Sequence, residues 1–147
     1  MKTIKITSFL IILLCANSLM AQLKVNIDGC WQTKWTDCGT SPNGAKLTFK
    51  KDLINNSQYT GAWGGGVDSN GYSHSGFMIG KLSGNTLNGT WYEVIYKDNS
   101  TCPNFSYQGK IQFTFKGDKF DGTWTDTNGP SKDCKKVMTW NGNRISQ

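Results

Sequence analysis

Apolar and polar residues alternate along several short stretches of this chain. The clearest stretch is 111–116, which reads Ile-Gln-Phe-Thr-Phe-Lys. Because successive side chains of a β-strand point to opposite faces, such alternation predicts strands with one buried face. The pattern predicts eight strands, at residues 25–35, 45–51, 57–63, 76–82, 86–97, 107–116, 119–125 and 134–141. No stretch carries a helical period over about 11 residues, so we expect an all-β protein.

One short pattern occurs four times: an apolar residue, any residue, Gly, any residue and Trp. Its tryptophans are Trp31, Trp63, Trp91 and Trp124, separated by 32, 28 and 33 residues. Each interval suits a β-hairpin and its connection to the next hairpin. The three marked residues of each copy are two positions apart, so they are expected to point inward from one strand. We expect the Gly to leave room for an indole of a neighbouring strand and most of the tryptophans to belong to the core.

Eight antiparallel strands with short links suit an up-and-down barrel, which has no exposed sheet edge and an interior that side chains nearly fill. A β-sandwich is the alternative architecture. The predicted links are short at one end and longer at the other, at residues 36–44, 64–75, 98–106 and 126–133. Loops on a rigid scaffold commonly carry function. We therefore place the functional end of the barrel at the long links.

The N-terminus has the composition of a secretory signal peptide. Two early lysines precede the apolar run 9–14, and the small residue Ala21 offers a cleavage site. Residues 1–21 are predicted to be the signal peptide of a secreted or periplasmic protein. A lipid anchor at Cys15 is the alternative, but Leu14 stands where lipoprotein signals have a small residue.

Residues 22–147 are predicted to form a single β-barrel domain. They contain 14 Lys and Arg against 10 Asp and Glu, a net charge of +4. The lysines are scattered and Arg144 is the only arginine, so we expect no nucleic-acid partner. The N-terminal apolar run is far shorter than the ~20 residues of a spanning helix, and we expect no membrane insertion after cleavage.

Four cysteines follow the predicted cleavage site: Cys30, Cys38, Cys102 and Cys134. An even number in an exported chain predicts two disulfides, with three possible connectivities. A zinc site is disfavoured because there is no C-x-x-C spacing and only one histidine. Cys102 and Cys134 lie in or beside neighbouring long links, so we favour that pair, which leaves Cys30 with Cys38. The second bond requires the first strand to bend or end near Trp35, since eight residues of straight strand span about 26 Å.

The segment Gly29-Cys30-Trp31 resembles the start of the calycin barrels, the superfamily of lipocalins and avidins, which pair a first-strand G-x-W with a basic residue just past the last strand. Here that residue is Arg144, and Tyr59-Thr60-Gly61-Ala62-Trp63 is similar to a T-G-aromatic segment of the avidin-like members. The resemblance implies an up-and-down barrel whose base is closed by a cation–π contact of Arg144 with Trp31. Four G-x-W copies depart from both families. The lack of a predicted C-terminal helix departs from the lipocalins, and the polar loop residues with which avidin-like proteins hold biotin have no counterpart here, so the resemblance implies a fold and no ligand.

Signatures of catalysis are absent from the sequence. It has one His and one Glu, and neither a G-x-S-x-G elbow nor a phosphate-binding loop. We predict no catalytic residues, no metal and no cofactor, and an enzyme ranks third among the functions considered. Residues 68–71 and 126–129 share a D-x-N-G pattern, which is ordinary turn chemistry and, as a weaker alternative, a source of calcium ligands.

The inward register continues past the tryptophans and places two carboxylates, Glu93 and Asp126, at the predicted barrel mouth. Aromatic walls with an acidic lip suit a small sugar, an amine or a hydrophobe. The predicted ligand-binding residues are Trp35, Trp63, Trp91, Glu93, Trp124 and Asp126. We therefore expect an exported, non-enzymatic binding module that holds a small ligand at its long-link end.

The alternative function is a secreted interaction or inhibitor protein, whose partner is an extracellular protein. Such a protein has a filled core and presents its loop tips to the partner. The candidate tips are Tyr72, His74, Phe105 and Lys132.

Overall fold

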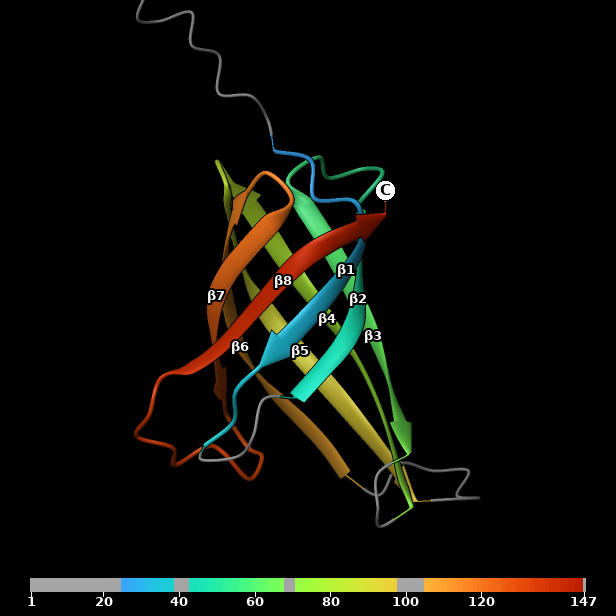
Figure 1. The fold of residues 1–147 in the computed structure, drawn as a ribbon, viewed down its shortest axis with the longest axis vertical. Coiled ribbons are helices and arrows are strands. Elements are labelled where there is room, and N and C mark those ends of the chain that lie inside the picture. Colours follow the sequence, from blue (N-terminus) through green and yellow to red (C-terminus); the bar gives the residue numbers. More distant parts are fainter. Residues whose placement is uncertain (1–24, 39–42, 68–70, 98–104, 147) are drawn as a thin grey trace, which may run out of the picture.

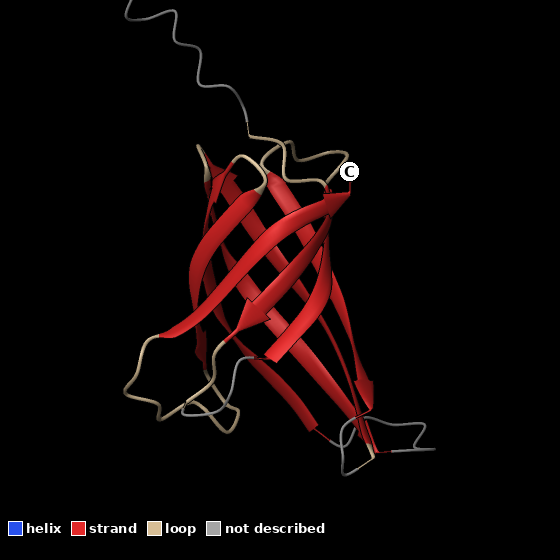
Figure 2. Ribbon diagram, in the orientation of Figure 1, coloured by secondary structure: helices blue, strands red, loops and turns tan. Residues whose placement is uncertain are grey.

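The computed structural model describes residues 25–38, 43–67, 71–97 and 105–146, and these residues form a closed β-barrel. Each strand pairs antiparallel with the next in chain order, and the last pairs with the first (Figure 1). The strands are β1 (Gly29–Trp35), β2 (Asn43–Lys51), β3 (Gln58–Val67), β4 (Tyr72–Ser83), β5 (Thr86–Lys97), β6 (Phe105–Lys116), β7 (Lys119–Asp126) and β8 (Met138–Ser146). The described part contains no helix (Figure 2). The predicted eight-stranded up-and-down barrel is confirmed, and the β-sandwich alternative is wrong.

The strand limits differ from the prediction by four residues at the start of β1, the end of β3 and the start of β4, and by up to five residues at β8. β1 begins at Gly29 and not at residue 25, while β8 spans Met138–Ser146 and not 134–141. β8 continues past residue 141 because it keeps pairing with β1, where Trp31 lies opposite Arg144. Arg144 is therefore a strand residue and does not lie past the last strand.

The two ends differ in link length less sharply than predicted, because the β2–β3 link at the short-link end spans residues 52–57 and the β3–β4 link at the other end spans only residues 68–71. Gly84 and Gly117 open the two-residue links of β4–β5 and β6–β7, and both adopt a left-handed backbone that glycine reaches without a side-chain clash. The links after β1, β3, β5 and β7 all leave the opposite end of the barrel (Figure 1). The predicted signal peptide and Cys15 lie outside the described residues.

Aromatic rings fill the barrel toward its short-link end. Trp31 is fully buried and meets three phenylalanine rings edge-on, those of Phe49, Phe115 and Phe120, at centroid distances of 6.4, 5.4 and 5.5 Å. Its indole N–H donates to the carbonyl oxygen of Ile27, 3.1 Å away. Edge-to-face pairs add to the stabilisation from buried apolar area, so this end of the interior is a packed core.

Arg144 closes the base of the barrel beneath this core. Its guanidinium carbon lies 4.5 Å from the centroid of the Trp31 ring. The same guanidinium donates to the backbone carbonyls of Asn26 and Asp28 and forms an ion pair with Asp118, Nε to Oδ1, at 3.0 Å. The cation–π contact expected between Arg144 and Trp31 is present, and the hydrogen bonds also tie the segment before β1 across the base.

The glycines of the repeat do not make room for the side chains that we expected. A Cβ built on Gly61 meets Met78 of β4, a sulfur-containing side chain and not an indole. The indole of Trp63 instead lies against Gly76, its direct partner across the β3–β4 pair, and a Cβ there overlaps the ring. Space for Trp63, and likewise for Trp91 opposite Gly109, is thus supplied by a glycine on the following strand.

The disulfide arrangement differs from the favoured prediction. Cys38 is bonded to Cys134, with Cα atoms 5.6 Å apart, so neither the Cys30–Cys38 nor the Cys102–Cys134 pair exists. β1 ends at Trp35, and barrel closure sets the segment that follows it beside the link that precedes β8. Cys30 lies near the start of β1, with its sulfur 3.4 Å from Thr48 Oγ1, and Cys102 lies outside the described residues.

Candidate functional site

Five tryptophans surround a hollow at the long-link end of the barrel. The hollow has a cavity volume of about 50 Å³ and is lined by Trp35, Trp63, Trp91, Glu93, Trp124 and Trp140. Four of these tryptophans come from the odd-numbered strands, which all run toward this end, and the fifth comes from the start of β8. We call this hollow the tryptophan pocket.

The indoles of the tryptophan pocket meet at steep angles. Trp63 and Trp140 lie 5.4 Å apart at 83°, and Trp91 and Trp124 lie 5.5 Å apart at 77°. Trp35 is tilted by 50° from Trp140, at 5.4 Å. The rings therefore form adjoining walls and not one stacked platform.

Backbone contacts hold two of these rings in place. The indole N–H of Trp91 donates to the carbonyl oxygen of Thr125 at 2.9 Å, and that of Trp124 donates to Thr36 at 3.0 Å. Trp91 lies opposite Gly109, where a Cβ would overlap its Nε1. Such side chains have little rotamer freedom, so the pocket is largely preformed.

Trp140 differs from Trp91 and Trp124 in the hydrogen bonding of its indole N–H. Only 5% of the residue is exposed, yet its indole N–H has no hydrogen-bond acceptor among the described residues. Most buried donors in proteins have a partner. The tryptophan pocket therefore contains a wall residue with an unused donor.

Glu93 is the charged residue of the tryptophan pocket. It lies on β5 two residues beyond Trp91, and its side chain is 24% exposed. His74 on β4 places its Nδ1 atom 3.3 Å from Glu93 Oε1. Burial raises the pKa of Glu93, the carboxylates of Asp126 and Asp37 raise it further, and His74 opposes the shift. The negative charge of Glu93 is thus only partly balanced by its neighbours.

Asp126, the second carboxylate predicted for the mouth, is placed differently. It ends β7, but its oxygens accept the backbone N–H groups of Asn128, Gly129 and Ser131, at 3.2, 2.6 and 2.9 Å. This is the turn chemistry of an Asp that folds the chain following it. Asp126 therefore shapes the link after β7 and acts on Glu93 only through its charge.

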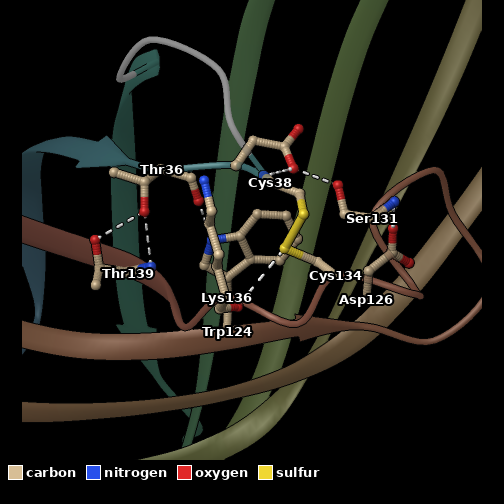
Figure 3. The surroundings of a disulfide bond; sticks show 9 residues. Thr36, Cys38, Trp124, Asp126, Ser131, Cys134, Lys136 and Thr139 are labelled. Atoms are coloured by element: carbon tan, nitrogen blue, oxygen red, sulfur yellow. Dashed lines mark hydrogen bonds between the residues drawn. A yellow bond between two sulfur atoms is a disulfide. The ribbon is translucent and has the colours of Figure 1, made fainter.

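The link between β7 and β8 is pinned to the segment that follows β1 (Figure 3). The Cys38–Cys134 disulfide joins them, and the hydroxyl of Ser131 donates to Asp37 Oδ1. Thr36 and Thr139 are also joined through backbone and hydroxyl groups. Trp124 lies beneath this link, so the disulfide stabilises one wall of the tryptophan pocket.

A second, larger hollow lies between β7 and this link. It has a volume of about 430 Å³, and its rim includes three exposed lysines, Lys132, Lys135 and Lys136. We call it the lysine groove. Flexible side chains form its rim, whereas the tryptophan pocket consists of side chains that the barrel holds.

Four of the six predicted ligand-binding residues are tryptophans, and all four line the tryptophan pocket together with Glu93. Sequence reasoning missed Trp140, although it alternates with Met138 along the last strand and so shares the inward face. Of the predicted loop tips, Tyr72 and His74 belong to β4, and Lys132 is exposed on the β7–β8 link. Phe105 begins β6. Within the described ranges, no three His, Cys, Asp or Glu side chains are grouped so that they could hold a metal ion.

The comparisons with known proteins support the fold alone. No family model matches the sequence, and no curated protein matches it. A solved structure of a redesigned β-barrel is similar, with a TM-score of 0.57 and 16% sequence identity over 81% of this chain and 91% of that chain. At this identity the similarity shows that the chain forms a β-barrel like that protein.

Proposed function

We propose that this protein is an exported, non-enzymatic binding module that holds a small ligand in the tryptophan pocket. The observation that carries the proposal is a preformed hollow with five indole walls and one half-buried carboxylate. Apolar walls with few polar groups are typical of ligand sites. The Cys38–Cys134 disulfide is consistent with a secreted or periplasmic location.

The size of the pocket limits what it encloses. A cavity of about 50 Å³ exceeds the ~10–15 Å³ that one water needs but is far below the ~300–1,000 Å³ of sites for drug-sized ligands. The pocket therefore holds a group of few atoms, either a very small molecule or the end of a larger one.

We also propose that the barrel is of the calycin type. The first-strand G-x-W and the basal contact of Arg144 with Trp31 support this relationship. It concerns the base of the barrel and not the ligand.

Titration of the purified protein with small ligands tests the proposed function through its intrinsic tryptophan fluorescence. We expect a saturable spectral change with at least one member of a panel of sugars, amines and hydrophobes. The Trp124→Phe variant should weaken it, whereas Asp121→Asn, on the exposed outer face of the same strand, should not. A spectrum unchanged by the entire panel contradicts the proposal.

The second candidate is an interaction protein that uses the lysine groove. It is supported by the packed core at the short-link end of the barrel. Exposed lysines on the β7–β8 link, which the Cys38–Cys134 disulfide holds in place, also support it. An acidic protein segment is the complementary partner. Replacing Lys132, Lys135 and Lys136 by Ser should then abolish the biological effect, while Trp91→Phe, which lines only the tryptophan pocket, leaves it intact.

A further inference from the structure

The proposed ligand site has the chemistry of a cation cage, and this inference rests on the proposed function. We propose that the tryptophan pocket binds the methylated ammonium group of a small compound. Choline has this chemistry. The shape of the pocket, its aromatic walls and its charge support the proposal.

The shape of the pocket favours a compact group over a flat one. Steep angles of 83° and 77° between paired indoles enclose a rounded space, whereas a sugar ring stacks best on one open platform. The volume of about 50 Å³ also excludes enclosure of a whole sugar ring. A methylated ammonium group is compact and presents methyl groups in all directions.

The walls suit a cation. Indole is the aromatic ring that attracts cations most strongly, and cages of aromatic rings recognise quaternary ammonium groups. The lining contains five tryptophans and neither Lys nor Arg. A positive charge on the ligand therefore meets ring faces and no like charge in the lining.

The charge of the pocket favours a positive partner over a neutral one. Glu93 is in the lining, and the carboxylates of Asp126 and Asp37 act on it from β7 and from the segment after β1. His74 faces Glu93 from β4 and is charged only when protonated. A half-buried carboxylate with carboxylate neighbours is stabilised when a cation enters.

Choline and its neutral isostere, 3,3-dimethylbutan-1-ol, test the proposal directly. They share their shape and hydroxyl group and differ in charge. We expect choline to bind at least about tenfold tighter in tryptophan fluorescence titrations, a difference between that of an exposed and that of a fully desolvated cation–π contact.

The variant Glu93→Gln should lose most of the preference for choline and keep its affinity for the neutral isostere. Asp121→Asn is the matched control and should behave like the unmodified protein. Circular dichroism checks the fold of each variant. The unmodified protein supplies a second measurement, because its affinity for choline, but not for the isostere, should fall as acid protonates Glu93.

The outcomes separate the two proposals. Equal affinities for choline and its isostere, or a response to sugars or hydrophobes alone, overturn the ammonium inference and leave the proposed function in place. A spectrum that no ligand of any class changes overturns both. Choline binding that Glu93→Gln and acid leave unchanged overturns the role of Glu93 as the counter-charge.

Discussion

Removal of the Cys38–Cys134 disulfide should destabilise the barrel strongly. The bond joins residues 96 positions apart, so it constrains most of the described chain in the unfolded state. In the chain-entropy description, a cross-link enclosing about 100 residues contributes about 4.7 kcal/mol at 25 °C. Native disulfides of small secreted domains typically contribute about 2–5 kcal/mol. We therefore expect Cys38→Ser with Cys134→Ser to lower the free energy of unfolding by about 3–5 kcal/mol.

Such a loss is large beside the ~5–15 kcal/mol of total stability that single domains have. The barrel should still form, because the hydrogen bonds between β1 and β8 close it without the disulfide. Near the tryptophan pocket, however, the link over Trp124 would lose its covalent tie. We expect the fluorescence of the variant to change although its β-type circular dichroism is retained.

Urea unfolding, followed by tryptophan fluorescence and circular dichroism, measures the effect. Each single Cys→Ser variant should lose about as much stability as the double variant, because either substitution removes the same bond. The dependence of the free energy on urea should steepen, since the unfolded chain without the cross-link exposes more surface. A double variant within about 1 kcal/mol of the parent would show that the entropic reasoning is wrong for this barrel.

Three further predictions concern the base, the packing and the charge of the barrel. Arg144→Ala should lower the free energy of unfolding by about 2–4 kcal/mol, because it removes the cation–π contact and two charged hydrogen bonds to backbone carbonyls. Asp118→Asn, which alters only an exposed partner, should change it by less than about 1 kcal/mol in the same urea assay. Gly76→Ala should cost about 1–3 kcal/mol and change the fluorescence by displacing the indole opposite, whereas Gly64→Ala, with open space at its Cβ, should be nearly neutral; equal losses would contradict this packing. Burial raises the pKa of Glu93, so its contribution to stability is full below the unfolded pKa and lost as pH rises through the native pKa. Between about pH 4 and pH 8, the melting temperature of Glu93→Gln should rise relative to that of the parent as pH rises. A difference that stays constant with pH would refute the raised pKa of Glu93.

Much of the fold could be predicted because strand formation follows a local pattern. In residues 111–116, the apolar side chains alternate with polar ones, and the structure buries Ile111, Phe113 and Phe115 on one face. The same two-residue period placed Trp63, Trp91 and Glu93 inward. Continuing the register along β5 was sufficient to bring Glu93 to the long-link end of the barrel.

The remainder of the site depends on contacts between distant residues. Trp140 enters the tryptophan pocket because β8 closes against β1, and Cys38 reaches Cys134 for the same reason. Neither contact follows from spacing along the chain. Asp126 has the inward register of a mouth residue, but the backbone N–H groups of its own link capture its carboxylate.

The sequence by itself determined the class of the fold, the number of strands, the end that carries the long links and the inward face of each G-x-W copy. These properties follow from side-chain alternation and turn residues, which act over a few positions. Only the tertiary structure decided the disulfide, the place of Arg144 within β8 and the size of the tryptophan pocket. Those properties depend on the register at which β1 and β8 meet, and a pairing between the two ends of the barrel leaves no periodic signal along the chain.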